Sequence, residues 1–262
     1  MPFIELSTVD STNNYALSQL HAGLAQHGSA FFAHEQVTGK AQRGKSWTTE
    51  KDTALILSIV INPRPLELRQ QFQLSACVAV SVYEFFSKYA GDATRIKWPN
   101  DLYWHDRKAG GILIENIIGG NESGRHENKP PRLATKWLWA VAGIGININQ
   151  ILFPEELRNP ISLRQITEKS FDPVELAKEL CALLNKNLKS LITNGFENIY
   201  ASYLSHLYKL NEPVKFKKSN RIFEAMVKSV SPTGDLIVQH AIEEEFGFGE
   251  IEWLIPGATS EK

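Results

Sequence analysis

Short apolar runs separated by polar turns occupy most of the chain, and they predict a mixed α/β protein. The longest run, residues 53–61 (TALILSIVI), is apolar at nearly every position, as expected of a buried strand. Residues 66–89 instead repeat apolar side chains at the spacing of a helix and follow Pro65. Further strands are predicted at residues 3–6, 29–36, 94–98, 101–106, 108–118 and 135–148.

Two other stretches predict helices. Residues 10–28 form the first, because Asp10, Ser11 or Thr12 can cap its start and Gly28 follows its end. Residues 154–208 are mostly helical in pattern, with Asp172 and Pro173 as a typical helix start.

The pattern changes at Pro213. Residues 213–218, 221–230, 235–240 and 243–253 are short strand-like segments divided by turn formers, which predicts a small β-domain, such as a barrel. We therefore expect a large domain over 1–210 that would carry any catalytic site, a small β-domain over 211–256 and a tail over 257–262. Residues 119–131 are polar and rich in turn formers, and they predict a mobile hairpin loop without chemistry.

Composition excludes several classes of protein. The 262 residues include 28 Lys and Arg against 29 Asp and Glu, so the net charge of −1 favours neither nucleic acid nor an anionic membrane. Only Cys77 and Cys181 are present, both in apolar helical contexts, which fits a reducing cytosol. No apolar run is long enough to span a bilayer, and the first residues lack a signal-peptide pattern. We expect a cytoplasmic protein.

A basic, glycine-containing loop is the first candidate for chemistry. Residues 38–47 (TGKAQRGKSW) crowd Lys40, Arg43 and Lys45 between glycines, and such cations hold phosphates, while Trp47 can stack on a base. Residues 39–46 also satisfy the G-x-x-x-x-G-K-[ST] pattern of a phosphate loop. That loop must open a helix, and here the next element is the strand at 53–61, so we do not predict one. A solvated basic loop is the alternative.

Three further stretches combine turn geometry with charge. Residues 97–102 (KWPNDL) place a cation, a tryptophan and a carboxylate in one turn, which a tight turn with a packed Trp98 would also explain. Lys108 precedes Ala109, Gly110 and Gly111 at the mouth of a strand, where it can meet an oxyanion or be a surface lysine. The glycines of residues 143–149 (GIGININ) lie inside a strand, which indicates close approach by a ligand or another backbone.

Taken together and in order, DSTNNYA, HEQVTGKAQRGKSW, KWPNDLYWHDRKAGGILIE and GIGIN resemble the biotin–protein ligases over nearly the whole chain. The resemblance implies an α/β fold, a mixed sheet with helices related to class II aminoacyl-tRNA synthetases, followed by a small Src-homology-3-like β-barrel. It implies that biotin and MgATP give biotinyl-5′-AMP and pyrophosphate, and that biotin then passes to a lysine of a biotin carboxyl carrier protein. Because the first strand begins at Phe3, we expect a monofunctional ligase without an N-terminal DNA-binding domain. A homodimer through the sheet edge is also typical of relatives.

The resemblance also implies the site residues. Those for biotin are Ser11, Thr12, Asn13, Gln36, Gly39, Lys40, Ala41, Gln42, Lys108, Gly111 and Gly143. Those for ATP are Lys40, Arg43, Lys45, Trp47, Lys97, Asn100 and Asn147. The catalytic pair is Lys108, which would bridge the carboxylate and the α-phosphoryl group, and Asp101, which either takes a proton from the incoming lysine or only orients it. No metal ligand from the protein is predicted, since Mg²⁺ would be held mainly by the phosphates.

The glycine loop departs from the family pattern, and Gln42 matters most. An arginine usually stands there and helps hold the intermediate, so we expect weaker retention of biotinyl-5′-AMP, with Arg43 compensating in part. Three other functions stay open at this point. They are a lipoate–protein ligase, a biotin-binding regulatory protein without turnover, and a DNA-binding repressor, which the net charge and the missing N-terminal domain disfavour.

Overall fold

The computed structural model describes residues 2–44, 46–47, 49–121, 134–155, 157 and 159–255. Lys45, the side chain of Arg43, most of the predicted hairpin loop at 119–131 and the predicted tail at 257–262 lie outside the described residues.

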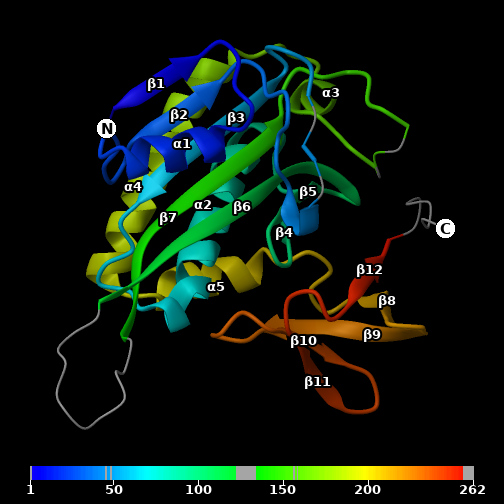
Figure 1. Cartoon of the computed structure of the whole chain (residues 1–262). Helices are drawn as coiled ribbons and strands as arrows, with labels where there is room; N and C mark the ends of the chain where they lie inside the picture. The colour runs from blue at the N-terminus through cyan, green and yellow to red at the C-terminus, as the bar shows by residue number, and fades with distance from the viewer. Residues whose placement is uncertain are drawn as a thin grey trace, which may run out of the picture.

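In the described part of the chain, the larger sheet has seven strands in the order β1-β2-β3-β7-β6-β5-β4 (Figure 1). Strands β1 and β2 pair in parallel, and the other neighbours pair antiparallel, so the sheet is mixed, as predicted. The bounds are β1 Phe3–Leu6, β2 Ala30–Ala33, β3 Ala54–Ile61, β4 Thr94–Lys97, β5 Asp101–Trp104, β6 Arg107–Asn121 and β7 Ala134–Asn147.

Helices cover the two faces of this sheet unequally. One face packs on α2 (Gln71–Ala90) and α4 (Pro173–Asn194), with α3 (Leu163–Thr167) and α5 (Glu197–Ser205) against α2 (Figure 1). Among the described helices, the one on the opposite face is α1 (Thr12–His21), which contacts β2, β3 and β7. Part of that second face is therefore open to a ligand.

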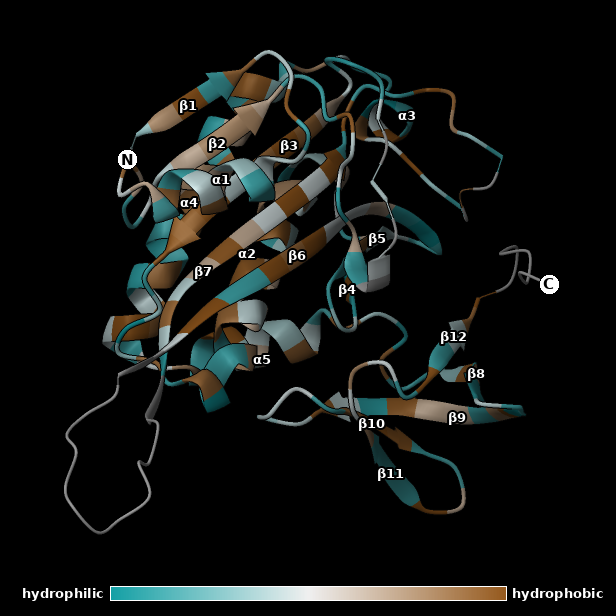
Figure 2. Ribbon diagram, in the orientation of Figure 1, coloured by the Kyte–Doolittle hydropathy of each residue, from teal (hydrophilic) through white to brown (hydrophobic). Residues whose placement is uncertain are grey.

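Successive side chains of a strand point to opposite faces, and β7 shows how this divides core from site. Its even positions, from Ala140 to Ile146, join the large core under α2 and α4. Val141, on the other face, packs with Ala16 of α1. The positions that follow Val141 on this face are two glycines and an asparagine, and Figure 2 shows the alternation as bands along β7. From Gly143 to Asn147 the strand thus buries one face and presents two bare glycines and one asparagine on the other.

Most predicted elements are confirmed, with shifted ends, but the predicted strand-like segment at 243–253 is two strands, β11 (Glu243–Phe246) and β12 (Glu252–Leu254), and the predicted helical region at 154–208 becomes helical only from Leu163. Helix α2 starts five residues after the predicted position, because Glu67 and Gln70 form a capping box around the short 3-10 helix η2 (Leu68–Gln70). Helix α1 ends at His21 and not near Gly28. Helix α4 begins where predicted, since the Asp172 carboxylate accepts hydrogen bonds from the backbone of the first turn.

The C-terminal strands form a separate five-stranded antiparallel sheet in the order β11-β10-β9-β8-β12, consistent with the predicted Src-homology-3-like barrel. Their bounds are β8 Pro213–Lys218, β9 Arg221–Val230, β10 Leu236–Gln239, β11 Glu243–Phe246 and β12 Glu252–Leu254. The barrel is fixed to the larger sheet by the Trp98 indole, which donates a hydrogen bond of 2.8 Å to the carbonyl of Gly234. The exact boundary at residue 210 stays a prediction.

Cys77 and Cys181 are buried in α2 and α4, as predicted. Burial raises the pKa of both thiols to about 12, so neither is a nucleophile near neutral pH. None of the described helices is long and apolar enough to cross a membrane.

A histidine joins three segments at the edge of the larger sheet. His34, which follows β2, lies with Nε2 at 2.7 Å from Glu5 Oε1 of β1 and with Nδ1 at 2.6 Å from Asp52 Oδ1, just before β3. The hydrogen bond to Glu5, followed by the contact with Asp52, raises the pKa of His34. The imidazolium therefore ties the end of the 38–53 loop to the edge of the sheet.

We expect this contact to stabilise the fold below the unfolded-state pKa of histidine, about 6.5, and to be lost as pH rises through the higher folded-state pKa. The stability difference between the wild type and His34→Gln should be about 1 kcal/mol or less at pH 5.5 and should shrink by about pH 9. Thermal unfolding of both proteins across this range measures it. His27→Gln, which removes a histidine outside this ion-pair group, should follow the wild-type pH dependence; a constant gap between wild type and His34→Gln would contradict the assignment.

Candidate active site

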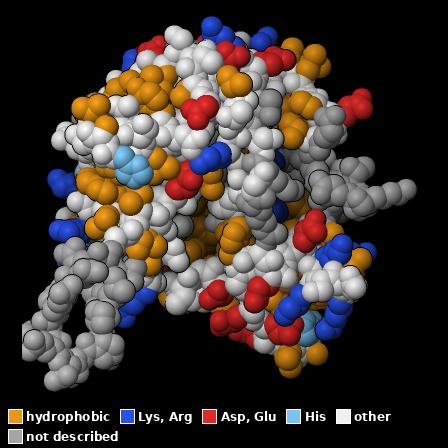
Figure 3. All heavy atoms as spheres, in the orientation of Figure 1, with side chains coloured by type: hydrophobic (Ala, Val, Ile, Leu, Met, Phe, Trp, Pro, Cys, Tyr) orange, Lys and Arg blue, Asp and Glu red, His pale blue; other side chains and the backbone are white. Residues whose placement is uncertain are grey.

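One large cavity, of about 910 Å³, lies on the open face of the sheet between α1, the 38–47 loop, the 97–102 turn and the barrel. Figure 3 shows the surface hollowed where the main body meets the barrel. The predicted site residues that line it are Ser11, Thr12, Asn13, Gln36, Lys40, Ala41, Gln42, Trp47, Lys97, Asn100, Asp101, Lys108, Gly111, Gly143 and Asn147. The structure therefore brings together residues from five separate segments of the sequence, 11–13, 36–47, 97–101, 108–111 and 143–147.

Gly39, Arg43 and Lys45 are the other predicted site residues. Gly39 is not among the lining residues but lies at the base of the loop, where its carbonyl accepts a 2.8 Å hydrogen bond from Trp47 N. A Cβ at Gly39 would lie 2.2 Å from the Trp47 carbonyl oxygen, so only glycine fits there. The Arg43 side chain and Lys45 lie outside the described residues.

Gly143 and Gly145 of β7 leave room for the side chains of two predicted site residues, Asn13 and Trp47. A Cβ on Gly143 would lie 2.4 Å from Asn13 Oδ1, and one on Gly145 would lie 2.7 Å from Trp47 Cε2. The two positions are one pleat apart on the same face, about 7 Å along the strand. The sequence predicts close approach by a ligand or another backbone at these glycines. The structure shows close approach, but by the side chains of Asn13 and Trp47.

A buried polar cluster surrounds the Gly143 position. The Thr12 backbone and hydroxyl both donate to Gln36 Oε1, at 2.7 and 3.0 Å, which fixes the orientation of the Gln36 amide. Ser58 Oγ lies 2.8 Å from Thr12 Oγ1 and 2.6 Å from Asn13 Oδ1. Ser58 was not predicted, because a hydroxyl inside the apolar run TALILSIVI does not by itself distinguish a site residue from a core serine.

Glu115 links this cluster to the glycine loop. Its Oε2 accepts a 2.8 Å hydrogen bond from Asn13 Nδ2, and its Oε1 lies 3.3 Å from Lys40 Nζ. Sequence analysis also missed Glu115, whose signal was a charge within the apolar run GGILIENII. The carboxylate holds Asn13 in one orientation and keeps the loop cation beside the cavity.

Lys108 and Asp101 form an ion pair, with Nζ 2.6 Å from Oδ1. Both are largely buried, at 33% and 18% side-chain exposure, which strengthens their interaction relative to a surface pair. Gly111, paired with Asp101 across β5 and β6 and with Gly145 across β6 and β7, lies beside them. A Cβ there would lie 3.3 Å from Asp101 Oδ1, so the glycine leaves room at the centre of the cavity.

The two predicted asparagines are tied to the backbone. The Asn100 amide donates to the Ile112 carbonyl and thereby holds the 97–102 turn against β6. The Asn147 amide donates to the Ile161 carbonyl at 3.1 Å. Both side chains thus fix the walls of the cavity, and their contact with a nucleotide stays a prediction.

Lys97 enters the cavity between aromatic rings. Its ammonium lies 5.3 Å from the Tyr103 ring centroid and 5.2 Å from that of Trp253, which belongs to β12 of the barrel. Burial lowers the pKa of Lys97 to about 8, while the Asp101 carboxylate opposes this shift. A substantial fraction of this side chain nonetheless stays cationic near pH 7.

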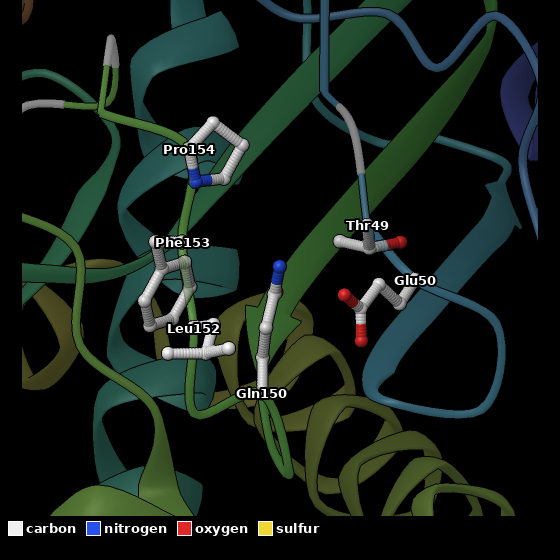
Figure 4. A pocket seen from close by; sticks show the side chains of 6 residues that line it. All are labelled: Thr49, Glu50, Gln150, Leu152, Phe153 and Pro154. Carbon is white, nitrogen blue, oxygen red and sulfur yellow. The ribbon is translucent and has the colours of Figure 1, made fainter.

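A second, smaller hollow of about 350 Å³ contains none of the predicted site residues (Figure 4). Gln150 extends between Phe153 and Pro154 on one side and Thr49 and Glu50 on the other. The lining of this hollow contains no lysine or arginine that could hold an anionic substrate. The large cavity is therefore the candidate active site.

Neither a phosphate loop nor a protein-built metal site is present in the part of the chain that the structure describes. Residues 42–44 form only a short 3-10 helix, and Lys40 pairs with Ser46 in an isolated β-bridge. The next element is the strand β3, so the phosphate-loop pattern is not followed by the helix that a phosphate loop requires. Among the described residues, no group of three or more His, Cys, Asp and Glu side chains could hold a metal.

Comparisons with known proteins identify the family of the chain. A profile of the Biotin/lipoate A/B protein ligase family matches residues 6–125. The bifunctional ligase/repressor BirA of Salmonella typhimurium is 36% identical over 242 residues, covering 89% of this chain and 68% of that protein. The biotin–[acetyl-CoA-carboxylase] ligase of Paracoccus denitrificans is 29% identical over 243 residues, covering 89% and 92%.

The fold agrees as well. The biotin protein ligase of Aquifex aeolicus, in a complex with biotin and ATP, superposes with a TM-score of 0.76 at 25% identity, covering 97% of this chain and 99% of that one. The chain spans about two thirds of the length of the bifunctional relatives it matches, from 62 to 72%. These matches in sequence and in fold show that the chain belongs to the biotin/lipoate A/B protein ligase family and is a ligase of the biotin protein ligase type.

Proposed function

We propose that this chain is an ATP-dependent biotin–protein ligase that forms biotinyl-5′-AMP and pyrophosphate, then transfers biotin to a lysine of a biotin carboxyl carrier protein. The observation that carries the proposal is the Lys108–Asp101 ion pair of 2.6 Å at the centre of one cavity. Beside this ion pair, Trp47 packs over Gly145, and the polar cluster packs over Gly143, the neighbouring position on the same face of β7. Such a cavity has room for an acid and a nucleotide together.

The polar cluster suits the ureido ring of biotin. A ureido group has one strong acceptor and two donors, and Ser11, Thr12, Asn13 and Gln36 offer hydroxyls and amides inside a buried wall. Ser58 and Glu115 orient these groups before a ligand arrives, which lowers the entropic cost of binding.

Adenylation requires two anions to meet. A carboxylate oxygen of biotin attacks the α-phosphorus of ATP, and the bond from that phosphorus to the pyrophosphate oxygen breaks. In this proposal the Lys108 ammonium, which lies at the centre of the cavity, bonds both groups and offsets the repulsion between them and the charge that develops on the phosphoryl oxygens. Asp101 accepts a hydrogen bond from that ammonium, which supports a role in orienting Lys108.

Transfer needs no nucleophile from the enzyme. The amine of the carrier lysine attacks the acyl carbon of biotinyl-5′-AMP, AMP leaves, and the lysine nitrogen loses a proton. Asp101 is the carboxylate nearest Lys108 in the site and is the candidate acceptor of that proton. Magnesium enters with ATP as part of the substrate and is held mainly by phosphates. The carrier protein and a homodimer stay predictions.

Replacing Lys108 tests the proposal. We expect the wild type to catalyse biotin-dependent exchange between ATP and pyrophosphate, and Lys108→Gln to lower the rate by about 10²–10³, as for loss of one transition-state contact. Binding of biotin alone, measured by calorimetry, should change far less, since the ring contacts stay in place. Lys136→Gln removes an exposed lysine of β7 and is the matched control.

The same exchange assay distinguishes the other functions. Stimulation by lipoate and not by biotin would point to a lipoate–protein ligase. Tight biotin binding without exchange in the wild type would point to a regulatory protein without turnover.

The two β7 glycines give a paired prediction. Gly143→Ala displaces Asn13 and should weaken biotin binding by about tenfold or more, because it breaks hydrogen bonds inside a buried cluster. Gly145→Ala displaces Trp47 and should raise the KM for ATP more than that for biotin. Exchange kinetics at varied biotin and varied ATP measure both variants. Equal effects of each variant on both substrates would contradict the division of the cavity.

A further inference from the structure

The cavity wall includes residues of the barrel, and Trp253 is the one that meets a cation. Lys97 stands in β4, paired across the 97–102 turn with Asp101. Its ammonium lies about equally far from the Tyr103 ring of the main sheet and the Trp253 ring of the barrel, at 5.3 and 5.2 Å. Both distances are within the range of cation–π attraction. The two rings form a cage, here called the Lys97 cage, that spans the two sheets.

The charges around the cage leave Lys97 available to an anion. Asp101 already accepts the Lys108 hydrogen bond of 2.6 Å, so two cations flank one carboxylate. Glu252 also acts on Lys97 and partly offsets the effect of burial. Within the described residues, no hydrogen bond to the Lys97 ammonium is formed; its contacts there are the two ring faces. The two rings therefore hold the Lys97 ammonium in place and leave its N–H groups able to donate hydrogen bonds to a ligand.

Trp253 has a feature that packing alone does not explain. Its ring packs on Phe216 and Tyr208, with centroid distances of 5.0 and 5.8 Å. Its indole N–H is buried and has no hydrogen-bond partner among the described residues. An unsatisfied buried donor costs stability, and phenylalanine would avoid that cost. What tryptophan adds over phenylalanine is a stronger cation–π face.

We propose that Trp253 is a positioning residue for the adenylation reaction: with Tyr103 it aims the Lys97 ammonium at the phosphates of ATP, so the barrel sets nucleotide affinity through this one side chain. The inference rests on the proposed function, because it takes ATP as the anionic substrate. The barrel acts here without any contact of its own with the phosphates.

Steady-state exchange kinetics on five proteins test the cage. They are the wild type, Lys97→Gln, Trp253→Leu, Trp253→Phe and the double variant Lys97→Gln/Trp253→Leu. Trp253→Leu should raise the KM for ATP by about 3- to 30-fold, the range of a cation–π contact, and leave the KM for biotin nearly unchanged. Trp253→Phe should have a smaller effect. The double variant should be no worse than Lys97→Gln, because Trp253 acts through Lys97.

Phe246→Leu is the control for a damaged barrel. Phe246 is buried and contacts Phe223, and its ring is not part of the Lys97 cage. A loss of thermal stability in this variant without a change in the KM for ATP would support the inference. An equal rise in that KM would overturn it, as would full additivity of the Lys97 and Trp253 substitutions.

The outcomes separate this inference from the proposed function. Wild-type exchange with biotin, together with an unchanged KM for ATP in Trp253→Leu, overturns the cage and leaves the ligase intact. Absence of exchange in the wild type overturns the ligase. In that case the affinity of the same variants for a nonhydrolysable ATP analogue, measured by calorimetry, still decides whether Trp253 acts through Lys97.

Discussion

The close approach of side chains to the bare face of β7 is the constraint on which the rest of the site depends. A strand of the central sheet must bury large residues on one face to hold α2 and α4, and Ile144 and Ile146 do so. On the other face the same strand presents Gly143 and Gly145, where any Cβ would collide with Asn13 or Trp47. The core and the cavity thus share one strand, divided only by the pleat.

That arrangement sets the spacing of the chemistry. The polar cluster at Gly143 and the indole at Gly145 stand one pleat apart, and β6 places Gly111 and the Lys108–Asp101 pair directly alongside. A small shift in the register of β6 against β7 would move the Lys108–Asp101 pair away from the polar cluster and from the Trp47 indole. The long pairing of these two strands, from Gly110 opposite Ile146 onwards, is what prevents such shifts. The 97–102 turn is fixed from its other side by the barrel, through Trp98 and Gly234.

Much of this could be predicted from the sequence, since strands and turns carry local signals. The buried run of β3, the Asp172 cap of α4 and the glycines of β7 each follow from neighbouring residues. The residues that escaped prediction, Ser58, Glu115 and Trp253, matter through partners at least 45 positions away in the chain. A serine in an apolar strand is indistinguishable from a tolerated core hydroxyl until the side chain opposite it is known. The same applies to a barrel tryptophan, whose role depends on how two sheets dock.

The central claim is that this cavity joins biotin to AMP, and isolation of the bound intermediate tests it most directly. The protein would be incubated with MgATP and equal amounts of biotin and lipoate, separated from free ligands, denatured and analysed by mass spectrometry for released acyl adenylates. The account predicts biotinyl-5′-AMP in the wild type and its loss in Lys108→Gln. Lipoyl-5′-AMP as the main product, or no adenylate from a protein that still binds biotin and ATP, would contradict it.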